Sequence, residues 1–289
     1  MSASLIVMIP LVLLGLVTAL CFIGCALQAG GLDLQGPYLD AVTNDPSLVA
    51  CWPLDDQADI SDNPDGATAA DISKNKLNGT YKGAALSVKV QQEGIVPGDV
   101  PPSGPPNTCA FFNGGRVSVP FAGALNPAKF TVEAWVEPQW AAGDTAVRGV
   151  VVSLNTAANA GYALFVQNNA WTAGVGTGAA LPTVALPVTF ENGGPVTSYL
   201  AMTFDGNSTL TLFVGVANGT LTSTSMTIPG TFLPEQSNTT ATPLFIGMGR
   251  PDLEAGMYPL NGFVQDVAIY NDALSTTAIT NRFNIGKGG

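Results

Sequence analysis

The sequence predicts an all-β domain of two antiparallel sheets, preceded by a single N-terminal hydrophobic helix. Three observations support this prediction. Charged residues make up only 11% of the 289 residues, against about 25% in an average soluble domain. From residue 108 onward, strand-like segments recur about every ten to fifteen residues, separated by turns rich in Gly, Pro, Ser, Thr and Asn. Residues 5–27 are uncharged and almost wholly apolar.

The apolar segment is long enough to cross a membrane as a helix. It would span about 34 Å at 1.5 Å per residue, against a hydrocarbon core of about 30 Å. We expect residues 5–28 to form a transmembrane helix or a helix buried among partner proteins in an assembly, because a helix that is hydrophobic all round suits both. A signal peptide and lipidation at Cys25 stay open, although the basic residues that usually precede such segments are absent.

Composition divides the remainder of the chain. Residues 29–46 contain Gly, Asp and Pro, and we expect them to form a stalk. Residues 47–284 show neither an internal linker nor a repeat, so we expect one domain there, with a short tail at 285–289.

The expected strands rest on alternation and on turn signals. Residues 209–216 alternate as a half-buried strand does, and the prolines of residues 95–107 exclude a central strand there. Ser275 can cap a helix over 276–283. The expected strands are 108–113, 116–121, 129–137, 148–154, 161–167, 170–176, 197–204, 209–216, 219–227, 243–247 and 262–270.

The charge and the missing histidine limit the function. A net charge of −11 and a pI of about 4.1 would repel phosphate backbones, so nucleic acid is excluded as a partner. The chain has no histidine, which removes the commonest general base and metal ligand. A bound metal would need oxygen ligands, which favours calcium over zinc.

Several motifs, in their order along the chain, resemble the laminin-G-like domains of the concanavalin A-like lectin/glucanase family. The motifs lie at residues 48–54, 78–81, 110–115, 130–138, 243–249 and 261–275. The resemblance covers most of residues 47–284. It implies a jelly-roll sandwich and, since most such domains are extracellular binding modules, a domain displayed on the surface of a cell or virion.

The resemblance also implies two structural features. Family members place the strands of Cys51 and Cys109 close together, which suggests a disulfide outside the cell; two buried free thiols are the alternative. Many relatives hold a structural calcium ion near the first and last strands. The candidate calcium ligands here are Asp55, Asp71 and Asp266, and solvated turn aspartates are the alternative.

Two further sets of residues bear on ligand binding and on catalysis. Sugar sites commonly combine an aromatic platform with polar groups, so the candidate ligand-binding residues are Trp140, Trp171, Arg148 and Arg250, although aromatic residues in strands more often belong to a core. Glu133 and Glu137 form a pair of carboxylates, but Trp135 replaces the central Asp of the related E-x-D-x-x-E glucanase motif. A structural or surface role for both is therefore favoured.

The sequence as a whole favours a non-catalytic, membrane-anchored recognition module that binds a glycan or a surface protein. None of the usual catalytic constellations is present. A structural subunit of a membrane complex, surface filament or virion, with residues 5–28 packed on partner helices, is the alternative. A divergent glycoside hydrolase is the least favoured reading.

Overall fold

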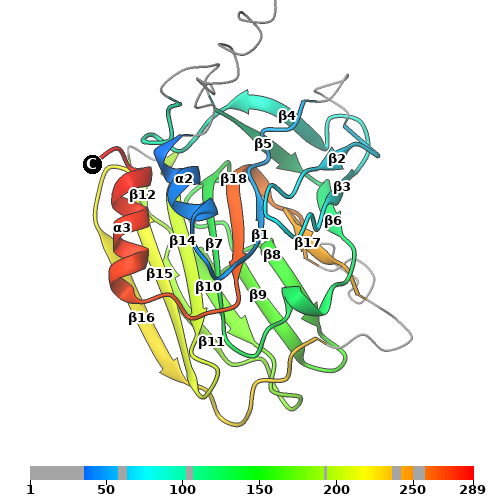
Figure 1. The fold of residues 1–289 in the computed structure, drawn as a ribbon, viewed down its shortest axis with the longest axis vertical. Helices are drawn as coiled ribbons and strands as arrows, with labels where there is room; N and C mark the ends of the chain where they lie inside the picture. Colours follow the sequence, from blue (N-terminus) through cyan, green and yellow to red (C-terminus); the bar gives the residue numbers. More distant parts are fainter. Residues whose placement is uncertain (1–35, 58–63, 102–106, 192–193, 236–241, 250–257) are drawn as a thin grey trace, which may run out of the picture.

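The fold is a two-sheet antiparallel sandwich, as the sequence predicts (Figure 1). The computed structural model describes residues 36–57, 64–101, 107–191, 194–235, 242–249 and 258–289. The hydrophobic helix expected at 5–28 lies outside these residues. Among the helices that are described, none is long and apolar enough to be a candidate membrane span.

Sheet A is organised around its central strand β18 (Asn261–Tyr270). One side of β18 pairs with β7, and the other side pairs first with β5 and then with β1. The spatial order of the sheet is β16 (Leu221–Thr227), β15 (Thr209–Val216), β14 (Ser198–Phe204), β7 (Phe130–Pro138), β18, β5 (Thr108–Asn113) and β4 (Val88–Glu93), with β1 (Leu48–Trp52) on β18.

Sheet B faces sheet A and also has eight strands. A separate hairpin of β12 (Phe190–Glu191) and β13 (Gly194–Pro195) and a 3-10 turn η1 (Gly123–Leu125) complete the elements outside the helices. The order of sheet B is β11 (Thr183–Pro187), β10 (Ala170–Val175), β9 (Ala160–Gln167), β8 (Arg148–Asn155), β17 (Leu244–Ile246), β6 (Arg116–Val119), β3 (Gly79–Lys82) and β2 (Thr68–Ala69).

The main core lies between the two sheets, where alternate residues of each strand point inward. Along β9, for example, Tyr162, Leu164 and Val166 join this core, while Ala163 and Phe165 belong to a separate small cluster on the outer face of sheet B. Alternation therefore decides which side chains stabilise the sandwich and which remain available at its surface.

Part of the expected stalk is a packed helix, which corrects the prediction for residues 29–46. The helix α2 (Pro37–Thr43) has proline at its first position, where proline is well tolerated. Its Tyr38 and Val42 are fully buried. The buried Asp99 anchors its start, since one carboxylate oxygen accepts hydrogen bonds from the backbone N–H groups of Tyr38 (3.0 Å) and Leu39 (3.2 Å). Burial raises the pKa of Asp99 to about 6, although these two bonds act in the opposite direction.

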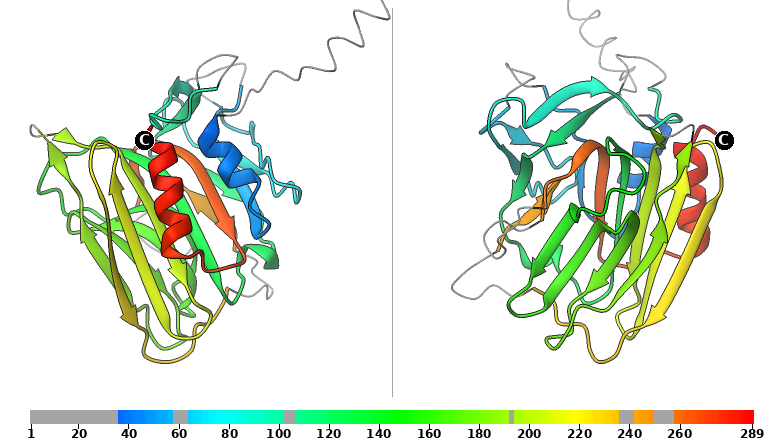
Figure 2. Two further views of the ribbon diagram at one scale, coloured as in Figure 1. Left: turned by 60° about the vertical axis from the view of Figure 1, so that its left-hand side comes forward. Right: turned by 180° about the vertical axis from the view of Figure 1, so that it is seen from behind.

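A second helix, α3 (Thr276–Gly286), lies beside α2 over the outer face of sheet A (Figure 2). Ser275 caps it, accepting a hydrogen bond from the N–H of Ala278 at 3.2 Å, as the sequence predicts. The helix runs into the expected tail, and Gly286 packs against Trp135 so closely that a Cβ there would lie 2.4 Å from the indole ring.

The two helices cover a second core that surrounds a buried carboxylate. Glu133 is fully buried and accepts hydrogen bonds from the Tyr199 hydroxyl (2.6 Å), the Tyr270 hydroxyl and the Arg282 guanidinium (2.9 Å). Arg282 also pairs with Asp45 at 2.7 Å. A buried charge is tolerated only when it is paired and hydrogen-bonded, so this network gives Glu133 the structural role that the sequence favoured.

This network predicts a large loss of stability for Arg282→Met. The substitution leaves Glu133 buried without its cation, which costs about 3–5 kcal/mol. The double variant Glu133→Gln/Arg282→Met is expected to recover part of the loss, because the unpaired charge is removed too. Urea denaturation of the wild type and both variants measures both effects. A loss below about 1 kcal/mol for Arg282→Met, the range of exposed pairs, would contradict this account.

Candidate functional site

A cavity lies on the outer face of sheet B. We call it the sheet B groove, and it has a volume of about 220 Å³. Its floor is formed by Val152 and Leu154 of β8 and by Ala163 and Phe165 of β9. These residues point outward because their neighbours along the strands point into the main core.

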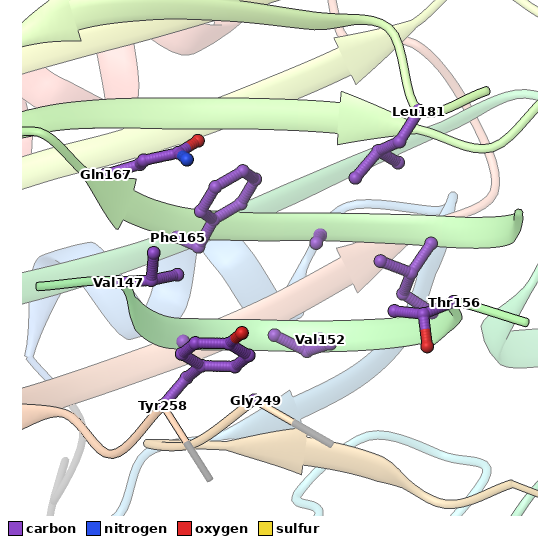
Figure 3. A pocket seen from close by; sticks show the side chains of 11 residues that line it. Val147, Val152, Thr156, Phe165, Gln167, Leu181, Gly249 and Tyr258 are labelled. Atoms are coloured by element: carbon purple, nitrogen blue, oxygen red, sulfur yellow. The ribbon is translucent and has the colours of Figure 1, made fainter. Parts of the chain in front are cut away.

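The side chains around the groove are arranged as a short channel with aromatic sides (Figure 3). Phe165 and Tyr258 lie on two sides of the cavity. Gln167 lies toward one end, and Thr156 and Leu181 lie toward the other. The arrangement offers rings and aliphatic carbons along the cavity and hydrogen-bonding groups at its ends.

One wall of the groove depends on two close backbone approaches. The Tyr258 carbonyl accepts hydrogen bonds from the N–H groups of Gly149 (2.9 Å) and Gly249 (3.2 Å). A Cβ at Gly149 would lie 2.4 Å from the Gly249 nitrogen, so only glycine allows this contact. Tyr258 itself has φ of 41°, a strained conformation for a bulky residue. Such strain is often found where a side chain is held for function.

None of the eleven described residues that line the groove is charged. The described residues of the groove therefore offer neither a nucleophile with an adjacent base nor a pair of carboxylates. Its chemistry suits a neutral ligand with an apolar face and a few hydroxyl groups, since most ligand sites combine apolar walls with a few polar groups.

The predicted aromatic platform is wrong. Trp171 is fully buried and Trp140 is only 6% exposed. Their rings pack edge to face in the main core, with centroids 6.0 Å apart. Both tryptophans lie near strand ends. A position near a strand end does not indicate whether a side chain points into the core or toward the surface.

Arg148, which the sequence suggested as a ligand-binding residue, has a structural role instead. Its guanidinium lies over the Trp140 ring at 5.1 Å and pairs with Asp144 at 2.8 Å. It donates a hydrogen bond to the Pro259 carbonyl at 3.3 Å, so it supports the segment that carries Tyr258. The fourth predicted residue, Arg250, lies outside the described residues.

The predicted Cys51–Cys109 disulfide is absent, and both residues are buried free thiols. Cys51 lies opposite Ala268 of β18, and Cys109 precedes Ala110, which lies opposite Val264. The register of β18 is interrupted between these two pairings, at the irregularity between Gln265 and Ala268. Both strands are neighbours of β18, but they pair with different halves of it.

The candidate calcium ligands are not gathered into a metal site within the residues that the structure describes. Within the described part of the chain, no group of three or more Cys, Asp or Glu residues could hold a metal ion. Both carboxylate oxygens of Asp71 accept protein hydrogen bonds, from the N–H groups of Cys51 and Leu77 among others. Asp55 is exposed, whereas Asp266 is fully buried. The three residues therefore do not fit a calcium ion that needs six to eight oxygen ligands.

The paired carboxylates Glu133 and Glu137 do not form a hydrolytic pair. They are four residues apart on one strand, which corresponds to about 13 Å. The two known glycosidase geometries need roughly 5–5.5 Å or 6.5–9.5 Å. Glu133 is also covered by the two helices, so no substrate could reach it.

Comparison with known families agrees with this architecture. Residues 112–280 match the profile of the concanavalin A-like lectin/glucanases superfamily. Because the match spans more than half of the chain, the protein belongs to this superfamily, which confirms the resemblance seen in the motifs. No match is found among curated protein sequences.

Solved structures share the fold at low sequence identity. Domain 4 of AbnA, a GH43 extracellular arabinanase from Geobacillus stearothermophilus solved in complex with arabinotriose, has a TM-score of 0.52 and 15% identity, covering 82% of this chain and 98% of that chain. Botulinum neurotoxin type C, described as entering cells through interaction with two ganglioside molecules, has a TM-score of 0.54 and 12% identity, covering 85% of this chain and 52% of that chain. This chain thus spans about half of the toxin chain.

The buried Asp266 predicts a pH-dependent gain of stability for Asp266→Asn. Neither carboxylate oxygen has a hydrogen-bond partner among the described residues, and burial, reinforced by the negative charges of Asp99, Asp55 and Glu133, raises the pKa of Asp266 well above the ordinary value. The folded state therefore binds this proton more tightly than the unfolded chain does, where the pKa is about 3.9. That contribution to stability is present below the unfolded-state pKa and is lost as pH rises through the folded-state pKa.

Asparagine stays neutral at every pH and tolerates the φ of 55° at this position. We therefore expect Asp266→Asn to be more stable than the wild type at pH 8, with the difference shrinking toward pH 4, as measured by urea denaturation at both values. A variant that is less stable at pH 8, matched by a loss of wild-type stability with a calcium chelator, would show a metal ion on Asp266 and contradict this prediction.

Proposed function

We propose that the protein is a non-catalytic recognition module that binds a neutral carbohydrate in the sheet B groove. The observation that carries the proposal is the uncharged groove between Phe165 and Tyr258. An aromatic ring can cover the apolar face of a sugar ring, because that face gains from leaving water as any apolar surface does. Gln167 and Thr156 at the ends supply donors and acceptors for hydroxyl groups.

Family membership supports carbohydrate binding without identifying a ligand. The likeness to the arabinanase domain solved with arabinotriose and to the neurotoxin that interacts with gangliosides is a likeness of fold, and one fold hosts many functions. The proposal of a neutral ligand comes from this chain itself. A sialylated or sulfated glycan would meet no cationic side chain among the described groove residues, and the net charge of −11 would repel it.

The proposal keeps the cellular context that the sequence suggests. Residues 5–28 would attach the protein to a membrane, and the domain would be displayed outside the cell or on a virion. The absence of catalysis is likewise part of the proposal. It is supported by the uncharged groove and by the separation of Glu133 from Glu137.

A glycan array probed with the full-length protein tests this function. We expect binding to neutral glycans and none to their sialylated forms. For a glycan that binds, Phe165→Leu keeps most of the apolar volume but removes the ring, and we expect it to weaken affinity about fivefold or more, equivalent to about 1 kcal/mol. Isothermal titration calorimetry measures the change.

The matched control is Phe263→Leu, which removes a half-buried ring from the outer face of sheet A. Phe263→Leu is expected to keep the glycan affinity within about twofold of the wild-type value, because distant sites act independently of each other. Equal losses in both variants, or no glycan bound by wild type, would contradict the proposed site.

A further inference from the structure

The outer face of sheet A is only partly covered by the two helices. On β5 and β18, Phe111 and Phe263 are half-buried at the surface, with ring centroids 5.0 Å apart. The strand register places Phe263 between Phe111 and Glu137 of β7. An aromatic pair thus stands directly beside a carboxylate on the uncovered part of this sheet.

A cleft of about 410 Å³ opens at this point. We call it the sheet A cleft. It is lined by Phe263, by Glu137 and Thr197, and by the segment that ends β4, which contributes Gln92, Glu93 and Gly94. The cleft therefore combines an aromatic wall, two carboxylates and neutral polar groups, unlike the uncharged sheet B groove.

The carboxylate of Glu137 is held in place by neutral donors. One oxygen accepts a hydrogen bond from the Thr197 hydroxyl at 2.8 Å, and the other accepts one from the Gln139 amide at 3.0 Å. In the part of the chain that the structure describes, neither Glu137 nor Glu93 takes part in a salt bridge. This contrasts with Glu133 on the same strand, which has Arg282.

The lysine on the same line of cross-strand neighbours, Lys89, does not supply a cation to Glu137. Lys89 of β4 lies opposite Phe111, on the far side of the aromatic pair from Glu137. Lys89 and Glu137 are three strand spacings apart, which corresponds to about 14 Å. The cleft is thus an oriented negative site beside a ring, and its positive counterpart is missing from the described residues.

We propose that the sheet A cleft binds a lysine or arginine side chain presented by a protein partner. Such a side chain has an aliphatic stem that packs on Phe263 and a cationic head that pairs with Glu137 and Glu93. The net charge of −11 attracts basic partners and speeds their encounter. This site lies on the opposite sheet from the sheet B groove, so the protein would hold a glycan on one face and a basic protein segment on the other.

Fluorescence anisotropy with a labelled hexa-arginine peptide tests the proposal on the full-length protein at physiological ionic strength. A hexa-citrulline peptide of nearly the same shape but without charge is the reference probe. We expect hexa-arginine to bind and hexa-citrulline not to bind. Glu137→Gln keeps both hydrogen-bonded neighbours and removes only the charge, and we expect it to weaken hexa-arginine binding about fivefold or more.

Asp272→Asn is the matched control for charge. It removes one negative charge just beyond the opposite end of β18, where the Asp272 side chain is 49% exposed and its carboxylate pairs with Lys129 at the surface. We expect it to change hexa-arginine affinity by less than about twofold, since a distant exposed charge is screened. Equal effects of Glu137→Gln and Asp272→Asn would show general attraction to an acidic protein and overturn the proposal.

The two aromatic variants separate this site from the proposed glycan site. Phe263→Leu is expected to weaken hexa-arginine binding and Phe165→Leu to leave it unchanged, the reverse of their effects on glycan affinity. A neutral oligosaccharide that displaces hexa-arginine from the wild type would overturn the inference, because the cleft would then be a carbohydrate site. Failure of glycan binding with intact peptide binding would reject only the glycan proposal.

Discussion

The ion pair between Glu133 and Arg282 determines which surface of this sandwich is available for binding. Glu133 lies in the middle of sheet A, surrounded by Tyr199, Tyr270 and Trp135, with no access to water. Such a carboxylate needs a cation that is brought to it. Arg282 on α3 provides that cation, and Asp45 holds the other end of the guanidinium. The helix is therefore fixed across sheet A, together with α2, while the groove on the outer face of sheet B stays open.

The two outer faces consequently have different chemistry. Helices and a buried network cover much of sheet A, and the part that remains exposed there includes an acidic cleft beside two phenylalanines. Sheet B keeps an uncharged groove whose wall depends on the close approach of Gly149 to the segment around Gly249 and Tyr258. Both sites use residues that the alternation of a strand turns away from the core, so neither competes with the packing that stabilises the fold.

Local patterns in the sequence were enough to predict most of the strands, although β4 and β11 were not predicted. Residues 108–113 and 209–216 form strands with those bounds, because alternation and turns are local signals. The helix α2 was missed, although Pro37 at its start and the buried Tyr38, Leu39 and Val42 form a recognisable pattern in retrospect. The Gly, Asp and Pro content of the surrounding residues favoured a stalk instead.

The candidate sites could not be predicted in the same way, because they depend on contacts between distant segments. Phe165 and Tyr258 line the same groove, and the approach of Gly149 to Gly249 and Tyr258 that forms its wall is encoded by no local pattern. The sequence also does not reveal whether a tryptophan near a strand end points inward or outward. Trp140 and Trp171 were therefore assigned to a surface, although they belong to the core. The disulfide prediction failed because it followed the adjacency of strands and not their register along β18.

The most direct test of the central claim is a crystal structure of the full-length protein with a glycan selected on the array. The account predicts a sugar ring in the sheet B groove, between Phe165 and Tyr258, with hydroxyl groups directed toward Gln167 or Thr156. A sugar bound instead in the sheet A cleft or at the loops that border the sheets would contradict it.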